Sequence, residues 1–529
     1  MSASVTPAEV RLDLVLRREI ALIDVREEHV FAQDHPLFAA NLPLSRLELE
    51  VLDRIPRPDA PVVVYDDGEG LAARAASKLG ALGYTRVRHL EGGLGAWRDA
   101  GLELFRDVNS YSKAFGELVE ARAHTPSILP EELKARLDRR EDLVVLDARR
   151  FEEFRTMSIP SGVSVPGAEL VLRAREVAPD PDTTIVVNCA GRTRSLIGAQ
   201  SLINAGAPNR IFALRNGTIG WSLAGLKLEH GAERRCPQTD DARARQAAAA
   251  ARDVAYRAGV RRLSPEDLDQ LADDGARTLY RFDVRTPEDY AAGHLPGFVS
   301  APGGQLVQET DAFAPVRGAR IVLFDDAGAR ADMTASWLAQ MGWDAFVLDG
   351  LDAAAATETG PGIARTFQPP PAEQIGALEL AGRLERGDVT VIDLGPSPRY
   401  RRTHIPGAVF AIRSRLAEAL DGLSACARRT LVLVSADGTL ARFAAPEVEA
   451  ITGRAPLVLA GGMLGWIWSE LPLASGAGRA LTPFEDVYRR PYEGADNSAE
   501  AMQAYLDWEF GLVAQLERDG SHGFFVIRT

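Results

Sequence analysis

The sequence of 529 residues is poor in cysteine, in histidine and in long apolar stretches. It has three cysteines and eight histidines. Cys189, Cys236 and Cys426 lie far apart, so neither a disulfide framework nor the paired spacing of a zinc site is present, and we expect no metal. No apolar run is long enough to span a bilayer, and the first 20 residues lack the pattern of a secretory signal. We therefore expect a cytoplasmic protein with no membrane partner.

A surplus of basic residues is also lacking. The chain has 60 Lys and Arg against 74 Asp and Glu, which gives a formal net charge of −14. Because few basic residues are left over to neutralise phosphates, we expect no nucleic-acid partner. The hydrophobic fraction of 46% is ordinary for globular cores, and the length allows several domains.

What the sequence does contain is one unit that occurs four times. In each copy a strand-like run ends at an aspartate, and a second run reaches a loop 42 residues later. The paired positions are Asp24 and Asp66, Asp147 and Cys189, Asp283 and Asp325, and Asp393 and Ser435. A third marker, a glycine-rich turn that ends in Gly-x-Trp or Gly-Trp, follows each loop but is eroded in the third copy. This recurrence indicates four tandem domains.

The strand-like runs are continuously apolar and alternate with helical patterns, which predicts parallel sheets covered by helices on both faces. We expect each copy to be a small doubly wound α/β domain with its ligand site at the carboxyl ends of the strands, where all four loops fall. The expected organisation is four domains at 6–105, 124–232, 260–352 and 372–475, a helical linker at 233–259 and a helical C-terminal tail at 476–529.

The tail has apolar residues at helical spacing. They are Met502, Tyr505, Leu506, Leu512, Val513 and Leu516. This stripe predicts a helix that packs on one of the domains or on a second subunit, so a homo-oligomer formed through the tail is one alternative. A lid over the active site is another, although no sequence feature supports it.

The second copy differs from the others in its loop, which reads CAGRTRS. At a strand–loop–helix junction the backbone N–H groups converge and the helix dipole adds positive potential, so an anion is favoured there. We expect Cys189 to be a thiolate, Arg194 to close the loop as an anion ligand, and Ser195 to cap the helix. The alternative is a buried cysteine that acts as a small hydrophobe. The predicted site is catalytic Cys189 with the substrate-binding residues Ala190, Gly191, Arg192, Thr193, Arg194 and Ser195.

These motifs resemble those of the rhodanese family of sulfurtransferases. The resemblance rests on the Asp-x-Arg strand end (Asp147, Arg149), on the loop 189–194 and on the Gly-x-x-Gly-Trp turn that begins at Gly217. The third and fourth copies add the segments YAAGHLPGF and YRRTHIPGAVF, whereas the second copy has Ser158 where the family has histidine. The four-copy arrangement resembles tandem rhodanese-related thiosulfate sulfurtransferases of bacteria.

The resemblance implies a covalent reaction. The Cys189 thiolate would attack the outer sulfur of thiosulfate, a small anionic sulfur donor, and sulfite would leave a cysteine persulfide. Cyanide or a thiol would then accept the sulfur, and no cofactor would be needed. Asp147 and Arg149 would support the structure.

The other loops have Asp66, Asp325 and Ser435 at the cysteine position, and these residues cannot carry persulfide sulfur. We therefore expect three inactive domains. A sulfur carrier or regulatory scaffold is an alternative to an enzyme. A rhodanese-fold phosphatase or arsenate reductase is less expected, because four residues rather than five separate Cys189 from Arg194.

Overall fold

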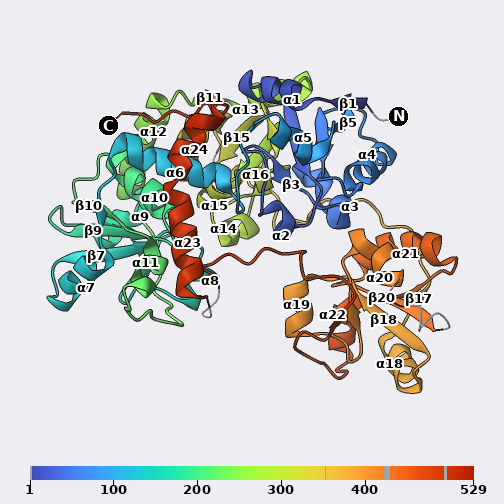
Figure 1. Cartoon of the computed structure of the whole chain (residues 1–529). Coiled ribbons are helices and arrows are strands. Elements are labelled where there is room, and N and C mark those ends of the chain that lie inside the picture. Colours follow the sequence, from blue (N-terminus) through green and yellow to red (C-terminus); the bar gives the residue numbers. More distant parts are fainter. Residues whose placement is uncertain (1–2, 352, 422, 424–428, 494–496, 529) are drawn as a thin grey trace.

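The computed structural model describes residues 3–351, 353–421, 423, 429–493 and 497–528, so Cys426 lies outside the described residues. Within them, four sheets of mainly parallel strands follow one another along the chain, and we call them units 1 to 4 (Figure 1). Helices flank each sheet. The predicted α/β fold class with four tandem domains is confirmed, while the residue boundaries given for the domains stay predictions.

Unit 2 carries the Cys189 loop. Its strand order is β6-β10-β9-β7-β8, which places β9 in the middle of the sheet. The strands are β6 (Ser127–Ile128), β7 (Leu143–Asp147), β8 (Val163–Ser164), β9 (Thr184–Asn188) and β10 (Ile211–Leu214). The helices are α7 (Pro130–Asp138), α8 (Phe151–Thr156), α9 (Leu170–Val177), α10 (Thr193–Asn204) and α11 (Gly217–Leu223). All five residues of β9 are buried, as expected of an apolar strand with helices on both faces.

Unit 1 has the same order of strands and is followed by a connecting helix, α6 (Ser110–Ala123). Its strands are β1 (Ala3–Val5), β2 (Ile20–Asp24), β3 (Ala40–Asn41), β4 (Val62–Tyr65) and β5 (Val87–Leu90). Its helices are α1 (Pro7–Val15), α2 (Glu28–Phe31), α3 (Leu47–Arg54), α4 (Leu71–Ala81) and α5 (Gly93–Asp99). Ten consecutive residues of α6, 110–119, are buried, so this helix lies inside the molecule.

Unit 3 follows the linker helix α12 (Asp241–Arg257). Its strands are β11 (Arg261–Leu263), β12 (Leu279–Asp283), β13 (Val299–Ser300), β15 (Arg320–Phe324) and β16 (Asp344–Leu348). Its helices are α13 (Pro265–Asp274), α14 (Pro287–Ala292), α15 (Gly303–Gln308), α16 (Thr310–Phe313) and α17 (Ala329–Gln340). The short strand β14 (Val316–Arg317) leaves this unit and pairs antiparallel with β2 of unit 1. Units 1 and 3 consequently share one large apolar core.

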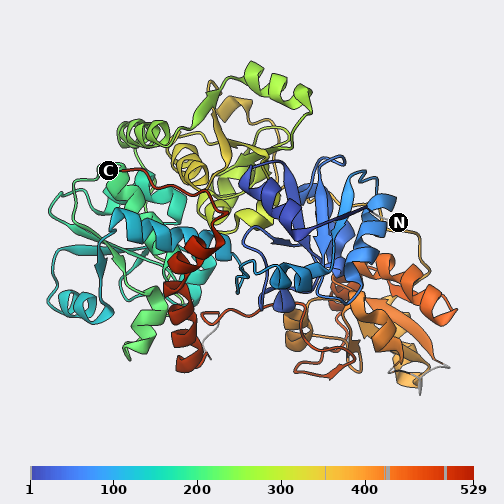
Figure 2. The same cartoon turned by 45° about the horizontal axis from the view of Figure 1, so that its top comes forward.

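Unit 4 has core clusters of its own and lies beside unit 1 (Figures 1 and 2). Its strands are β17 (Gln374–Ile375), β18 (Val389–Asp393), β19 (Val409–Phe410), β20 (Thr430–Val434), β21 (Leu457–Leu459) and β22 (Arg479–Ala480). Its helices are α18 (Ala377–Arg386), α19 (Ser397–Arg402), α20 (Leu416–Asp421), α21 (Thr439–Thr452) and α22 (Gly462–Trp468).

Strand register explains the 42-residue spacing of the sequence. In unit 2, Asp147 at the end of β7 pairs with Asn188 at the end of β9, and Cys189 is the next residue. The corresponding pairs are Asp24 with Tyr65, Asp283 with Phe324, and Asp393 with Val434. The 42-residue spacing that recurs in all four units therefore follows from the same pairing of two neighbouring parallel strands in each unit.

The tail forms two helices, α23 (Ala499–Phe510) and α24 (Leu512–Asp519), as predicted. An extended segment crosses from unit 4 to unit 2 before α23 begins (Figure 1). α23 packs on α6 and α11, and α24 packs on α6. Leu506, Leu512 and Leu516 are at most 1% exposed, so much of the apolar stripe is buried within this chain. A homo-oligomer through the tail stays a prediction.

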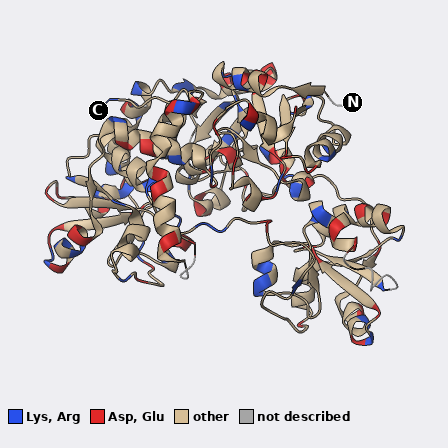
Figure 3. Ribbon diagram, in the orientation of Figure 1, with Lys and Arg blue, Asp and Glu red and all other residues tan. Residues whose placement is uncertain are grey.

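Charged side chains of both signs are interspersed over all four units (Figure 3). In the part of the chain that the structure describes, no helix combines the length and the apolarity needed to cross a membrane.

Candidate active site

Cys189 is the first residue after β9, and α10 begins four residues later at Thr193. The cysteine is 2% exposed. Its Sγ donates a hydrogen bond to Ser195 Oγ at 3.4 Å, and Ser195 Oγ donates to the carbonyl of Arg192 at 2.8 Å. The prediction that Ser195 caps the helix is wrong, because Ser195 lies in the first turn of α10 and no side chain caps that helix. Ser195 instead orients the thiol.

The glycine-rich turn that forms the third sequence marker makes backbone hydrogen bonds to the loop. Amides of Thr218 and Ile219 donate to the carbonyls of Cys189 and Ala190, both at 3.0 Å. Gly217 has φ +53°, and a Cβ there would lie 2.3 Å from the Cys189 carbonyl oxygen. Only glycine combines this backbone conformation with so close an approach. The turn therefore fixes the backbone around the cysteine.

Arg194 lies beside the thiol and is bound by a carboxylate. Its two terminal nitrogens donate to Glu153 at 2.8 and 2.9 Å, and the pair is mostly buried. Arg194 and its hydrogen bonds hold the pKa of Glu153 well below its usual range despite burial. The positive charge of Arg194 also acts to lower the pKa of Cys189. The structure thus brings Arg194 to the cysteine, and its contact with a substrate stays a prediction.

Arg192 has a different environment from the one expected. Its guanidinium donates to both oxygens of Glu117, at 2.7 and 2.9 Å, and also binds Glu120. Both acids lie on α6. The guanidinium is also 4.2 Å from the ring centroid of Phe510 on α23. In this structure Arg192 joins the loop to α6 and to the tail, and its contact with a substrate stays a prediction.

Several segments outside unit 2 close the space above the loop. Loop residues 189–194 line a small cavity. The remaining lining residues are Lys113 of α6, Gln308 of α15, Tyr492 of the extended segment, and Tyr505 and Glu509 of α23. The tail therefore covers the candidate site, which is the alternative that the sequence did not support.

The burial of Cys189 beneath the tail changes the protonation state expected for its thiol. Burial raises the pKa of Cys189 and outweighs the opposing influence of Arg194 and Ser195. Glu509 raises it further. The prediction that the loop holds a thiolate is thus wrong for this closed structure, because desolvation disfavours the charged form. The loop contains a neutral thiol beneath the tail.

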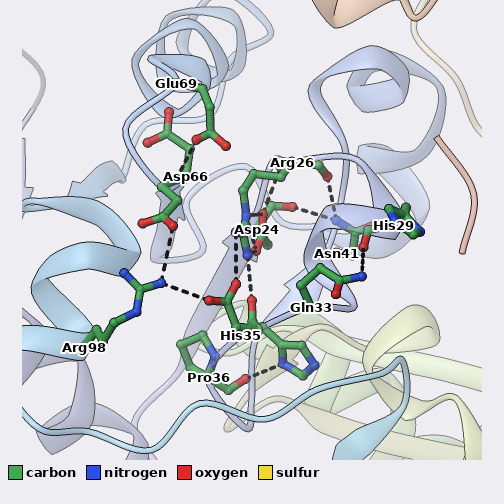
Figure 4. Close-up of polar contacts among 12 residues, drawn as sticks. Asp24, Arg26, His29, Gln33, His35, Pro36, Asn41, Asp66, Glu69 and Arg98 are labelled. Carbon is green, nitrogen blue, oxygen red and sulfur yellow. Dashed lines mark hydrogen bonds and ion pairs between the residues drawn. The ribbon is translucent and has the colours of Figure 1, made fainter. Parts of the chain in front are cut away.

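Asp147 and Arg149 form a buried ion pair next to the loop. The guanidinium donates to Asp147 at 2.9 and 2.8 Å and to the carbonyl of Met157 at 2.6 Å. Asn188 donates to the same aspartate at 2.7 Å. These contacts hold the ion pair within unit 2, and its role in structural support stays a prediction. Unit 1 repeats the pair with Asp24 and Arg26 (Figure 4).

Aspartates occupy the anion-binding position in two sister loops. Asp325 of unit 3 accepts hydrogen bonds from the amides of Gly328, Arg330 and Ala331. Asp66 of unit 1, also drawn in Figure 4, accepts from the amides of residues 68 and 72 at 3.1 and 2.9 Å. Each carboxylate therefore fills the position that an anionic ligand would take.

In unit 4 the same place is held by Ser435, whose Oγ accepts from the amide of Ala441 at 3.2 Å. Within the described residues, no group of three or more His, Cys, Asp and Glu is arranged to hold a metal ion.

Sequence analysis missed the side chains that cover the loop. Lys113 and Gln308 lie in segments that carry no motif. Glu509 did leave a signal, because it falls on the apolar stripe four residues after Tyr505 and three before Leu512. An acidic residue on the apolar face of a helix indicates a buried polar contact or a functional site.

Comparison with known proteins identifies the family. The model of the Rhodanese-like domain matches residues 7–100, 129–224, 264–350 and 377–467. The crystal structure of a thiosulfate sulfurtransferase from Pseudomonas aeruginosa is 58% identical and covers 99% of this chain and 100% of that chain, with a TM-score of 0.98.

Curated relatives match over shorter stretches. The thiosulfate sulfurtransferases of Azotobacter vinelandii and Pseudomonas aeruginosa are 30% and 33% identical over 161 residues, which are 26% of this chain and 58% of each relative. This chain spans about half the length of the first such relative, an uncharacterised Synechocystis protein. Because the domain matches cover most of the chain and the match to the solved structure runs from end to end, the chain belongs to the rhodanese family.

Proposed function

We propose that the protein is a thiosulfate sulfurtransferase in which Cys189 carries the transferred sulfur. The observation that carries this proposal is the position of Cys189. It lies at a strand–loop–helix junction beside Arg194, where the three sister loops have aspartate, aspartate and serine. Family membership and the names of the related sulfurtransferases support the same activity.

The proposed reaction has two steps. Cys189 loses its proton, and its sulfur attacks the outer sulfur of thiosulfate. A new S–S bond forms to Cys189, the S–S bond of thiosulfate breaks, and sulfite leaves with the electron pair. In the second step cyanide or a thiolate attacks the outer sulfur of the persulfide, and the cysteine thiolate is released.

The chain's own residues serve each requirement of this reaction. Arg194 and the amides of the loop favour the negative charge of the donor and of the thiolate. Ser195 fixes the direction of the thiol through its hydrogen bond. The tail excludes water from the persulfide. Because the thiol is neutral in the closed site, we infer that the tail moves away to admit the donor, that Cys189 ionises, and that the tail closes again over the bound donor.

The test is persulfide formation. Thiosulfate should add one sulfur atom to the peptide that contains Cys189, as measured by mass spectrometry, and cyanide should remove it. Cys189→Ser should neither gain the sulfur nor turn over. Cys236→Ser and Cys426→Ser are the controls and should behave as wild type. Burial raises the pKa of Cys236 to about 11, which makes its thiol a poor nucleophile at neutral pH.

Two results would contradict the proposed function. Near-normal turnover by Cys189→Ser contradicts the assignment of the nucleophile. One round of sulfur loading without steady turnover indicates a sulfur carrier or scaffold rather than an enzyme. The thiols of Cys189 and Cys236 are free, which suits a reducing compartment, and a cytoplasmic location is part of the proposal.

A further inference from the structure

A buried acid on the tail faces the loop and has no role in the reaction described above. Glu509 is 1% exposed. Its Oε1 accepts a hydrogen bond from Tyr505 at 2.7 Å, whereas its Oε2 has no hydrogen-bond partner among the described residues. A Cβ built on Gly191 would lie 3.3 Å from Oε2. The unpaired oxygen is therefore directed at the loop, two residues beyond Cys189.

The cations nearest to Glu509 already have carboxylate partners. Lys113 donates to Asp107 at 2.6 Å, and Arg192 binds Glu117 and Glu120 on α6. The third cation that lines the cavity, Arg194, is paired with Glu153 as described above. A negative charge on Glu509 would thus be buried beside other negative charges, which is costly.

The carboxyl group is consequently neutral at neutral pH. Burial raises the pKa of Glu509 to about 8, and Glu117 acts in the same direction. Lys113, the hydrogen bond from Tyr505, and Arg192 oppose the rise. A neutral carboxyl group has one O–H donor, whereas a carboxylate can only accept. A carboxylic acid kept neutral by an apolar site is a known way to donate a hydrogen bond to an oxyanion.

We propose that Glu509 is a specificity residue of the Cys189 site, in which its neutral carboxyl group donates a hydrogen bond to an oxygen of the sulfur donor. This inference rests on the proposed function. It names the donor class as compounds that carry a sulfonate-type oxygen next to the transferred sulfur, such as thiosulfate. Donors without such oxygens gain nothing from Glu509. Once ionised, Glu509 repels an anionic donor.

The groups around Glu509 restrict what can titrate with it. Lys113 and Glu117 face it from α6, Arg192 and Cys189 from the loop, Tyr492 from the extended segment, and Tyr505 from its own helix. The pKa values of both tyrosines are raised well above their usual range by burial. Ionisation of Cys189 favours reaction as pH rises, so it cannot imitate a loss of donor affinity.

The experiment compares three variants by steady-state kinetics with thiosulfate from about pH 6 to about pH 9. Glu509→Gln keeps a neutral donor at every pH, Glu509→Ala removes it, and Glu500→Gln is a control at an exposed position of the same helix. A hydrogen bond to a charged group contributes about 1.5–3 kcal/mol, so Glu509→Ala should raise KM roughly 10- to 100-fold. In wild type, kcat/KM should fall as pH passes about 8, whereas Glu509→Gln should not show this fall.

A second sulfur donor distinguishes a change in donor specificity from a loss of folded structure. Turnover of glutathione persulfide, which has no sulfonate oxygen, should change less than threefold in Glu509→Ala. An equal loss with both donors would overturn the proposal, because it would mean that the tail had merely been displaced. An unchanged KM for thiosulfate in Glu509→Ala, or a wild-type pH profile in Glu509→Gln, would overturn it as well.

Binding alone distinguishes failure of this inference from failure of the proposed function. Thiosulfate affinity is measured by calorimetry in Cys189→Ser, which cannot transfer sulfur, with and without Glu509→Ala or Glu509→Gln. A loss of affinity with alanine and not with glutamine supports the role of Glu509 whether or not wild type turns over. Equal affinity in all three proteins contradicts that role even if wild type is an active sulfurtransferase.

Discussion

At the scale of single residues, one position separates the four units chemically. The aspartates of units 1 and 3 fold back onto the amides of their own loops and act as built-in anions. Unit 2 has a cysteine at this position, so no carboxylate fills the loop and an anionic ligand can be accepted there. The residue directly after the strand thus determines whether the loop amides bind a carboxylate of the same loop or are available to an anionic ligand.

Asp325→Cys tests this reading in unit 3. Arg330 stands where Arg194 stands in unit 2, but it donates hydrogen bonds to two carboxylates, Glu169 of unit 2 and Asp326, whereas Arg194 donates only to Glu153 among the described residues. We therefore expect little sulfur loading of Asp325→Cys in a Cys189→Ser background. Mass spectrometry after thiosulfate treatment provides the measurement. Loading comparable to that of Cys189 would show that a second carboxylate on the loop arginine does not prevent sulfur loading.

Arg194→Ala should weaken donor binding. A charge-assisted contact contributes about 1.5–3 kcal/mol, so KM for thiosulfate should rise roughly 10- to 100-fold. The substitution also leaves Glu153 without its cation, so the double variant Arg194→Ala with Glu153→Gln serves as the control for stability. If the double variant is as stable as wild type and KM is still unchanged, Arg194 does not contact the donor.

At the scale of elements, the close contact between the glycine-rich turn and the loop determines the shape of the site. The same contact recurs in units 1 and 4, where a Cβ on Gly93 or Gly462 would lie 2.5 and 2.4 Å from the carbonyl of Asp66 or Ser435. In unit 3 the residue at this position is Leu351, so the third marker lacks the glycine that the close approach requires.

Gly217→Ala and Gly225→Ala form a matched pair. Both glycines have positive φ, but a Cβ on Gly225 meets open space. Each substitution should lose about 1–2 kcal/mol of stability from backbone strain, and Gly217→Ala should lose a further ~1–3 kcal/mol from overpacking against the loop. Urea unfolding measures the difference. Equal losses would contradict the idea that the turn supports the cysteine loop by direct contact.

At the scale of the whole molecule, unit 4 is attached to unit 1 through a buried polar contact. Glu27 of unit 1 accepts hydrogen bonds from Ser45 at 3.0 Å and from Ser414 of unit 4 at 2.7 Å. Arg413 of unit 4 binds Glu48 of unit 1 at 2.8 and 2.9 Å. Burial raises the pKa of Glu27 to about 7. The interface therefore contains a carboxyl group that ionises near neutral pH.

The attachment of unit 4 should weaken as pH rises. The pKa of Glu27 is higher in the folded interface than the ordinary value of 4.5, so its stabilising contribution is complete below about pH 4.5 and is lost as pH rises through about 7. Limited proteolysis should detach unit 4 faster at pH 8 than at about pH 5.5. Glu27→Gln should remove this dependence, while Glu379→Gln, exposed on α18, should keep it. A pH dependence that persists in Glu27→Gln would place the titrating group elsewhere.

The sequence alone determined the features that depend on neighbours along the chain or on a repeated register. The 42-residue spacing is one of these, because Asp147 and Cys189 are set by the pairing of β7 with β9. The order of strands and helices, the four units and the cysteine loop follow from local patterns of apolar residues and from recurrence. Such patterns repeat in every copy, so they can be recognised without coordinates.

Only the tertiary structure decided the chemistry of that loop. Burial raises the pKa of the Cys189 thiol, and Arg192 binds acids on α6. Lys113 and Glu509 reach the same cavity from segments about 400 residues apart in sequence. Protonation and the pairing of charges depend on burial and on partners from distant segments, and no local pattern records which segments will meet.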